Sequence, residues 1–456
     1  MNRKEEQYKK MTEQPVSRLI LSLAVPTIIS MIVTAVYNTA DTYFVSRLGT
    51  SASGAVGIVM SLMSLIQSVG FMIGMGSGSW MSRLLGQQQE KKASRVAASG
   101  FYFAIFLGIL TAVFGLIFLD PLISLLGATE TIRPYAKEYT QYILYAAPIM
   151  IASFTMNKQL CSEGKARFAM CGIAFGGILN IFLDPLFIFT LDLGIAGAAI
   201  ATSLSQLTSF GILLYMFVSG RTIAKLNISN AAKDIKMYVE IVKSGLPSLF
   251  RQGLASVASI ALNTMAAGYG DSAVSAMAIV TKVFMLIFSV LVGFGQGYQP
   301  VAGYNYGAKL YGRVRSAFVF MVRSATIFMT IFAVFGYFAA PQLIRFFISS
   351  DPEVVAIGTA SLRFQCLSMP FLPLNICCNM TFQTIGKSGL ATFLSTARQG
   401  YAFLPLILLL PRVIGLTGVE IAQPLADVIA FAVCIPYAVK FFAELKQQEN
   451  DLKEEK

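Results

Sequence analysis

The chain alternates from end to end between long apolar runs and short polar segments, many of which are basic. The apolar runs hold about 20 residues or more, enough for a helix to cross a hydrocarbon core of roughly 30 Å. Most runs have no polar face, whereas the helices of a soluble bundle are amphipathic. The pattern therefore predicts an all-α integral membrane protein with twelve transmembrane helices. The spans are expected at residues 17–44, 53–80, 95–119, 135–157, 168–190, 195–219, 238–267, 274–300, 315–340, 355–382, 390–411 and 416–441.

The composition agrees with this prediction and narrows the chemistry. Of the 456 residues, 55% are apolar and 13% are charged, against about 25% charged in soluble domains. The absence of His excludes a Ser-His-Asp triad and any His metal ligand. The six Cys lie in or beside predicted spans without a CxxC spacing, so we interpret them as reduced packing residues rather than zinc ligands. The first apolar run is too long for a signal peptide and is expected to remain as the first span.

The formal net charge of +12 is explained by the predicted topology. Lys and Arg concentrate in the N-terminus, in alternate loops and in the C-terminus, and they are sparse in the intervening loops. This asymmetry is the positive-inside signal, and it predicts that both termini are cytoplasmic. The basic residues therefore indicate orientation in a lipid bilayer, and no nucleic-acid partner is expected.

The sequence also contains an internal repeat. When the chain is shifted by 221 positions, Pro26 falls on Pro247 and Gly74 on Gly295, and other Pro and Gly pairs follow in the same order. The repeat predicts an N-terminal lobe at 1–219 and a C-terminal lobe at 238–456, each with six spans. The basic stretch 220–237 is the expected cytoplasmic linker between them.

Two lobes of six spans have the same orientation, so a pseudo-two-fold axis along the membrane normal should relate them. Rocking of such lobes gives alternating access, which favours a transporter in which a monomer is sufficient. The sequence GKS at 386–388 resembles the end of a P-loop, but Thr381 stands where the first Gly of that motif belongs. ATP-driven pumping by this chain is therefore not expected.

A set of polar residues interrupts the apolar spans of the first half. Asn180 and Asp184 lie on one face of the fifth span, and Pro185 removes a backbone donor there. Thr202 follows a small-residue stretch of the sixth span, and Asp41 lies in the first span. Ionisable groups at this depth usually face a protein interior or a wet cavity and usually have a function. If the first, fifth and sixth spans pack together, these polar groups share one pocket.

Such a pocket has two natural uses and one structural alternative. Two carboxylates in a low dielectric do not both ionise readily, so one of them can hold a proton. A Na⁺ ion bound by Asp41, Asn180, Asp184 and Thr202 would offset the charges instead. The structural alternative is a helix kink stabilised by hydrogen bonds, without ion binding.

The second half lacks the acidic pair. Leu262 and Leu406 match Asp41 and Asp184 in the repeat, so ion coupling is expected in the first lobe. The buried charges here are Arg251 and Lys282, with Asp427 in the last span. We expect the two basic residues either to pair with Asp427 or to extend toward an interface.

The chain resembles the multidrug and toxic compound extrusion (MATE) family, in its DinF-like, MepA-type branch. The resemblance rests on Pro26, on YNTADTYF at 37–44, on SRLLG at 82–86, on LNIFLDPLFIF at 179–189 and on GIAGAAIAT at 194–202, and it covers roughly residues 15–445. It implies the MATE fold in a bacterial or archaeal cytoplasmic membrane. It also implies export of small amphipathic, mostly cationic compounds, driven by H⁺ or Na⁺, without a cofactor and without enzymatic activity.

The resemblance also implies roles for individual residues. Asp41, Asn180, Asp184 and Thr202 match the polar set of related first lobes, and Pro26 and Pro185 are the expected helix bends. The NorM-type branch has acidic cation ligands in its second lobe, whereas no acidic residue lies well inside spans seven and ten here. Candidate substrate-binding residues are Tyr37, Asn38, Asn157, Arg251 and Lys282.

Three rival functions agree less well with the sequence. A lipid-linked precursor flippase of the same superfamily should have several converging basic residues in its cleft, and only Arg251 and Lys282 lie clearly inside spans. A major-facilitator symporter should have a characteristic basic loop after the second span, which SRLLGQQQEKK matches only loosely. A channel or membrane enzyme is least favoured, because no nucleophile–base pair or metal cluster is evident.

Overall fold

The computed structural model describes residues 3–348 and 351–454, and its regular elements there are all helical. Ten segments have the length and apolar composition of membrane spans. They are α2 (Val16–Ser46), α3 (Thr50–Gly86), α4 (Glu90–Ile117), α7 with η1 (Ala166–Thr190), α8 (Gly194–Val218), α10 (Asp271–Gly307), α11 (Tyr311–Phe347), α12 to α13 (Pro352–Ile385), α14 to α15 (Ser388–Ile414) and α16 (Leu416–Glu454).

The other two predicted spans are also long helices, α6 (Arg133–Ser162) and α9 (Ile235–Ala267). Both helices are less apolar than the ten segments above. Each contains a basic residue that is not at its end, Lys158 in α6 and Arg251 in α9. The chain is a multi-pass membrane protein, and twelve helical segments correspond to the twelve predicted spans. Many helices extend beyond the predicted ends, because polar residues at both ends continue the helix outside the apolar core.

Three spans change helical geometry along their length. In α7 (Ala166–Pro185) the α-helix gives way directly after Pro185 to the π-helix η1 (Leu186–Thr190). The span Pro352–Ile385 contains α12 (Pro352–Ser368), the 3₁₀ turn η3 (Met369–Phe371) and α13 (Leu372–Ile385). The span Ser388–Ile414 contains α14 (Ser388–Thr396), the π-helix η4 (Ala397–Ala402) and α15 (Phe403–Ile414). Proline accounts for the first two changes, since it removes a backbone donor from the helical ladder.

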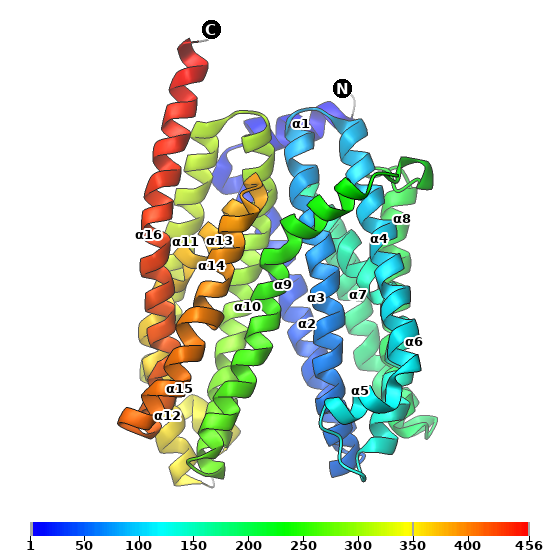
Figure 1. Cartoon of the computed structure of the whole chain (residues 1–456), viewed down its shortest axis with the longest axis vertical. Helices are drawn as coiled ribbons and strands as arrows, with labels where there is room; N and C mark the ends of the chain where they lie inside the picture. Colours follow the sequence, from blue (N-terminus) through cyan, green and yellow to red (C-terminus); the bar gives the residue numbers. More distant parts are fainter. Residues whose placement is uncertain (1–2, 349–350, 455–456) are drawn as a thin grey trace.

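The helices form two groups that lie side by side (Figure 1). In the first group α2, α3, α4, α6, α7 and α8 pack on one another, and in the second α9 to α16 do so. Both chain ends lie on the same side of the bundle, which we call the terminal side (Figure 1). The domain boundaries 1–219, 220–237 and 238–456 stay a prediction.

The two groups meet through glycines in the halves of α2, α3, α9 and α10 nearest the terminal side. A Cβ added to Gly76 of α3 would lie 2.0 Å from the carbonyl oxygen of Ile241 on α9. A Cβ added to Gly297 of α10 would lie 2.4 Å from the Cα of Ala24 on α2. Small residues let helix backbones approach this closely. Away from the terminal side the ribbons of α9 and of α2 and α3 diverge (Figure 1).

Three short elements were not predicted: α1 (Arg3–Glu13), α5 (Leu119–Leu125) and the 3₁₀ turn η2 (Ile228–Asn230). The segment around α1 reaches the second helix group, because Asn305 donates to the carbonyl oxygen of Met11 and Arg313 to that of Gln14. The polar sequence of α1 hides this role, since it has no continuous apolar face.

Candidate functional site

Three helices bring the predicted first-lobe residues into one buried cluster. Asp41 comes from α2, Asn180 and Asp184 from α7, and Thr202 from α8. Asn180 donates its side-chain N–H to Asp184 Oδ1 at 3.0 Å and to Thr202 Oγ1 at 3.5 Å. Asp41 is 6% exposed and Asp184 is fully buried. The helical spacing of Asn180 and Asp184 explains why one amide reaches both partners.

Tyr139 on α6 joins Asp41 to this cluster, although no feature of its sequence surroundings marks it as a site residue. Its hydroxyl donates to Asp41 Oδ2 at 3.5 Å, and its side chain is fully buried. The same hydroxyl also interacts with Thr202 and is within electrostatic range of Asp184. A buried tyrosine thus lies between the two carboxylates. The residue of α6 that was selected from the sequence, Asn157, lies toward the other end of this helix.

Several oxygens of the cluster accept no hydrogen bond from the residues that the structure describes. They are Asp41 Oδ1, Asp184 Oδ2 and Asn180 Oδ1, and all three are buried. Buried acceptors without donors are costly. A proton on a carboxylate, or a hard cation among carboxylate and amide oxygens, supplies the missing positive partner. The donor set of Asp41, Asn180, Asp184 and Thr202 consists only of oxygen ligands, which fits Na⁺.

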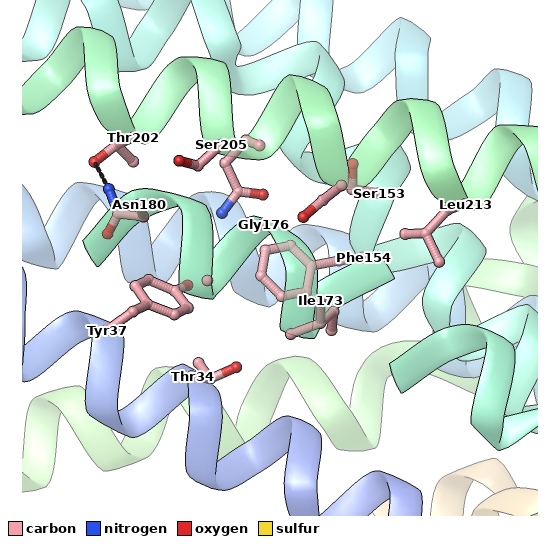
Figure 2. Close-up of a pocket in the computed structure, with 13 residues that line it drawn as sticks. Thr34, Tyr37, Ser153, Phe154, Ile173, Gly176, Asn180, Thr202, Ser205 and Leu213 are labelled. Carbon is pink, nitrogen blue, oxygen red and sulfur yellow. Dashed lines mark hydrogen bonds between the residues drawn. The ribbon is translucent and has the colours of Figure 1, made fainter. Parts of the chain in front are cut away.

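A cavity of about 20 Å³ adjoins the cluster (Figure 2). Tyr37, Asn180 and Thr202 line it, together with Ser205 and Phe154. A space of this size holds one water-sized species. Binding sites for drug-sized molecules measure about 300–1,000 Å³. In this conformation the cavity therefore has room for a small ion or a water and not for an organic compound.

Two other predicted residues lie outside the cluster. The Asn38 side chain is partly exposed on α2 and does not line the cavity. Asn157 is buried and donates to the carbonyl oxygen of Ala169 on α7 at 2.9 Å. In the second half, Asn379 donates to the carbonyl oxygen of Ala391 at 2.8 Å, and both residues stand 222 positions after their counterparts. Because the contact recurs in both halves, we interpret Asn157 as a link between helices rather than a substrate ligand.

The candidate basic residues differ in their surroundings. Arg251 on α9 has a buried Nη1 that meets no acceptor among the described residues. Lys282 on α10 is exposed. The expectation that one of them pairs with Asp427 is wrong, because the partner of Asp427 is Arg398, whose Nε lies 2.7 Å from Asp427 Oδ1. Arg398 comes from η4, in the predicted span 390–411, where sequence reasoning did not identify a buried charge.

Asp427 is the centre of a saturated network in the second half. Besides Arg398, it accepts hydrogen bonds from the side chains of Gln423, Gln365 and Ser368 at 2.8, 2.9 and 3.0 Å. Asp427 is 1% exposed and Arg398 is 8% exposed. Because this carboxylate already has a permanent cation and three neutral donors, it has no oxygen left for a transported ion.

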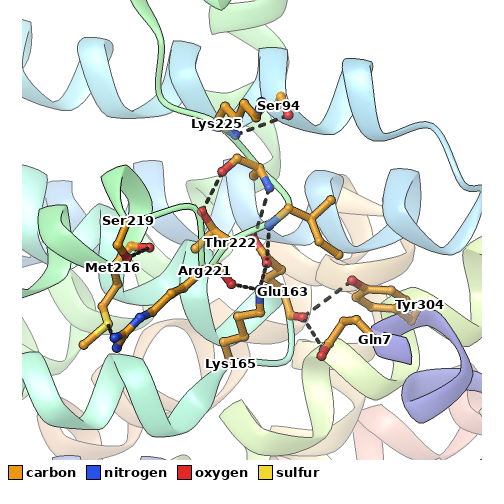
Figure 3. A network of polar contacts seen from close by, with 12 residues as sticks. Gln7, Ser94, Glu163, Lys165, Met216, Ser219, Arg221, Thr222, Lys225 and Tyr304 are labelled. Atoms are coloured by element: carbon orange, nitrogen blue, oxygen red, sulfur yellow. Dashed lines mark hydrogen bonds and ion pairs between the residues drawn. The ribbon is translucent and has the colours of Figure 1, made fainter. Parts of the chain in front are cut away.

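A second polar network ties the linker to the terminal side (Figure 3). Glu163, which follows α6 and is fully buried, accepts from the backbone N–H groups of Ile223 and Ala224 and pairs with Lys165 at 2.6 Å. Its carbonyl oxygen accepts from the Tyr304 hydroxyl of α10 at 3.5 Å. Burial raises the pKa of the Glu163 carboxyl above its ordinary value of 4.5. This network therefore connects the linker, the first helix group and the second.

These features define a class of protein. Paired helix groups, glycine-lined contacts on one side and an acid cluster inside one group are the features of a membrane transporter. A model of the MatE family matches the chain twice, at residues 26–186 and at residues 247–407. The protein belongs to the MatE family, and the two matches are 221 residues apart, the same shift as the internal repeat.

Relatives and solved structures cover nearly the whole chain. Multidrug export protein MepA of Staphylococcus haemolyticus (strain JCSC1435) is 26% identical over 443 residues, which are 96% of this chain and 97% of that protein. MepA of Staphylococcus aureus (strain MSSA476) is 24% identical over 417 residues, 91% of this chain and 92% of that protein. A crystal structure of MATE in complex with MaL6 has a TM-score of 0.91 at 26% identity, covering 96% of this chain and 99% of that one. A structure of a multidrug resistance MATE family transporter in an outward-facing conformation has a TM-score of 0.90 at 26% identity, covering 96% and 98%. The resemblance to MATE transporters of the MepA type is confirmed.

Proposed function

We propose that this protein is a cation-coupled multidrug efflux antiporter, which exports small amphipathic, mostly cationic compounds by alternating access in exchange for H⁺ or Na⁺. The observation that carries the proposal is the buried cluster of Asp41, Asn180 and Asp184, in which three oxygens accept no hydrogen bond from the described residues and Asn180 lines a cavity of ion size. The MepA relatives are multidrug export proteins, which supports export of several compounds rather than one.

The cluster acts as the coupling site because its free energy depends on an added positive charge. With no ion bound, two buried carboxylates face each other across Tyr139, and their mutual repulsion favours separation of α2 from α7. A proton or Na⁺ removes that repulsion and lets the helices approach. The bound ion then changes the equilibrium between the two lobe arrangements, because its affinity differs between them.

Pro185 and Pro26 transmit this change along their helices. The π-helix that follows Pro185 is a local break directly beside Asp184, and such breaks are common at functional sites. Pro26 lies in α2 next to the glycine contact of Ala24 with Gly297. Motion of α2 about Pro26 therefore alters both the acid cluster and the contact between the helix groups.

The orientation follows from the basic loops. The termini and the linker are cytoplasmic by the positive-inside rule, in a bacterial or archaeal cytoplasmic membrane. The glycine contacts are then on the cytoplasmic side, and the diverging halves of α2, α3 and α9 face outward (Figure 1). In the proposed cycle an external ion reaches Asp41 and Asp184 from this outer side before the drug leaves. Each chain holds a complete acid cluster, so a monomer is sufficient.

Aromatic side chains are suited to the cationic part of a substrate. Tyr37 and Phe154 line the cavity beside the acids, and ring faces attract cations. The alternative function is flipping of a lipid-linked oligosaccharide or precursor across the membrane, which the same fold supports when its central cleft is basic. Accumulation of lipid-linked cell-wall precursors on depletion of this protein, without change in dye export, would favour that alternative.

The test is export of ethidium from proteoliposomes of the purified protein, with a pH gradient and a Na⁺ gradient imposed separately. Wild type should export with one of the two gradients, and Asp41→Asn and Asp184→Asn should each lose at least 90% of the gradient-driven rate, on the order of the tenfold change that 1.4 kcal/mol produces. Asp120→Asn is the matched control, because Asp120 is an exposed partner of Lys137. Normal export by both cluster variants would overturn the coupling assignment.

A further inference from the structure

Lys158 is a buried cation at the contact between the two helix groups. From the sequence it was expected in a loop, because the fourth span was predicted to end at residue 157. It is 2% exposed near the end of α6. Its ammonium donates across the contact to Gln296 Oε1 on α10 at 2.8 Å and lies 4.4 Å from the centre of the Phe71 ring on α3. Among the described residues no carboxylate forms an ion pair with it. The charge is therefore held only by a neutral amide and an aromatic face.

A second cation adds to this excess of positive charge. Arg251 lies on α9, which packs on α3 as α6 does, and its guanidinium is within electrostatic range of the Lys158 ammonium. Its buried Nη1 has no acceptor in the part of the chain that the structure describes. Two buried cations without a counter-charge among the described residues are unfavourable, because their desolvation is not offset. The unfavourable arrangement therefore needs a reason other than stability.

The internal repeat shows that packing alone does not require the charge. A Cβ added to Gly74 would lie 2.9 Å from Lys158 Cβ, and one added to the equivalent Gly295 would lie 2.4 Å from Met380 Sδ. Met380 stands 222 positions after Lys158, the same shift that relates the two buried asparagines. The same glycine-lined slot thus takes an uncharged methionine in the second half. An unbranched apolar chain satisfies the packing, and the ammonium of Lys158 is an addition to it.

We propose that Lys158, Arg251 and Gln296 form an oxyanion-binding site between the two helix groups, which takes the sulfonate, carboxylate or phosphate group of an amphipathic ligand. The site combines two cationic side chains with the amide of Gln296, whose oxygen accepts from Lys158, and the Phe71 ring beside the ammonium supplies an apolar surface for the body of the ligand. Because the donors come from both groups, the ligand bridges them and responds to their separation.

This inference rests on the proposed transport function and adds to it a second polar site. The acid cluster around Asp41 is occupied by the coupling ion, whereas the Lys158 site receives the anionic group of the transported molecule. Zwitterionic and acidic amphipaths therefore belong to the substrate range beside the cationic ones. The anionic group that binds here belongs either to a lipid headgroup or to a small exported compound. The test distinguishes the two by changing the lipid composition of the membrane.

The experiment measures equilibrium binding of two radiolabelled probes to the purified full chain in phosphatidylcholine nanodiscs, without any gradient. The probes share a butylnaphthalene body and differ only in the polar group, a sulfonate or a trimethylammonium. Lys158→Met copies the second half of the repeat, Lys158→Arg keeps the charge, and Arg251→Met removes the second cation. Lys440→Met, an exposed lysine of α16, is the control.

Lys158→Met and Arg251→Met should each weaken sulfonate binding by about tenfold or more, the effect of losing one charge-assisted hydrogen bond. Lys158→Arg should stay within about threefold of wild type by the same scale. Binding of the ammonium probe should be unchanged in all variants. Added phosphatidylglycerol should compete with the sulfonate in wild type if lipid headgroups occupy the site, and should have no effect if only small compounds do.

Equal affinity of wild type and Lys158→Met for the sulfonate, or an equal loss for both probes, would overturn the proposal. The thermal unfolding temperature checks the fold. Lys158→Met should unfold at the same or a higher temperature than wild type, and if it does not fold, Lys158→Gln and Arg251→Met carry the test. Asp41→Asn should keep sulfonate binding, so failure of ion coupling and failure of the oxyanion site are distinguishable.

Discussion

The ion pair of Arg398 and Asp427 offers a quantitative test of how the second half is stabilised. Arg398 lies 2.7 Å from the Asp427 carboxylate, and its guanidinium carbon lies 5.2 and 4.7 Å from the ring centres of Phe284 and Phe288. The perturbation is a double-mutant cycle of Asp427→Asn and Arg398→Met. Asparagine keeps the shape of the aspartate, and methionine keeps most of the length of the arginine chain.

The two single variants should differ in magnitude. Asp427→Asn leaves the guanidinium buried without a counter-charge, with a neutral amide oxygen and two rings as partners, which should lower the free energy of unfolding by about 3–5 kcal/mol. Arg398→Met leaves the carboxylate with three neutral donors, so its loss should be about 1.5–3 kcal/mol. The double variant removes both charges, so its loss should be smaller than the sum by about 2 kcal/mol.

The assay is unfolding in mixed micelles by titration with sodium dodecyl sulfate, followed by circular dichroism. The exposed pair of Lys137 and Asp120 is the control, since its side chains are 44% and 55% exposed at 3.1 Å. Its coupling energy should stay below about 1 kcal/mol. A coupling energy within about 0.5 kcal/mol of zero for the buried pair would refute the reasoning, because independent sites are additive to that extent.

Three further predictions concern packing, the linker and the repeat. Gly76→Ala should lower ethidium export by about tenfold, because the added Cβ would lie 2.0 Å from the backbone oxygen of Ile241. The control Gly57→Ala should export normally, because its Cβ would meet nothing within 4 Å. Equal export rates for the two variants would contradict the close-contact argument. The raised pKa of Glu163 means that its folded form favours the proton, so wild type should lose stability as pH rises from 4.5 through that raised pKa. Glu163→Gln should flatten this dependence in thermal unfolding curves from pH 4 to 8, and parallel curves would contradict it. Asn157→Ala should lower the free energy of unfolding by about 1–3 kcal/mol without changing the concentration of ethidium that half-saturates export, and an altered half-saturating concentration would restore it as a substrate-binding residue.

Most of the fold was predictable because the bilayer constrains it. Continuous apolar runs identified the helical spans, and the helix-breaking residues identified where several of them end or bend. The polar helix α1 and the short elements α5 and η2 were not predicted, because their stability comes from contacts with other segments rather than from their own apolar pattern.

The candidate site was predictable only in part. Asp41, Asn180 and Asp184 stood out because polar groups in apolar spans are costly. Three other residues did not stand out: Tyr139, Lys158 and Arg398. Tyrosine is common in membrane spans, Lys158 follows the predicted end of its span, and Arg398 was not identified as a buried charge in its span. Their importance follows from what their side chains meet in space.

The sequence by itself determined that this chain crosses a membrane many times, that it repeats after 221 residues and that its acids belong to the first half. These properties depend on local composition and order, which a linear pattern records. Only the tertiary structure decided that Tyr139 joins Asp41 to the α7 pair, that Asp427 is neutralised by Arg398, and that Lys158 meets no counter-charge among the described residues. Whether a buried charge is paired depends on which helices are neighbours and how they are rotated, and the membrane constrains span length without constraining either.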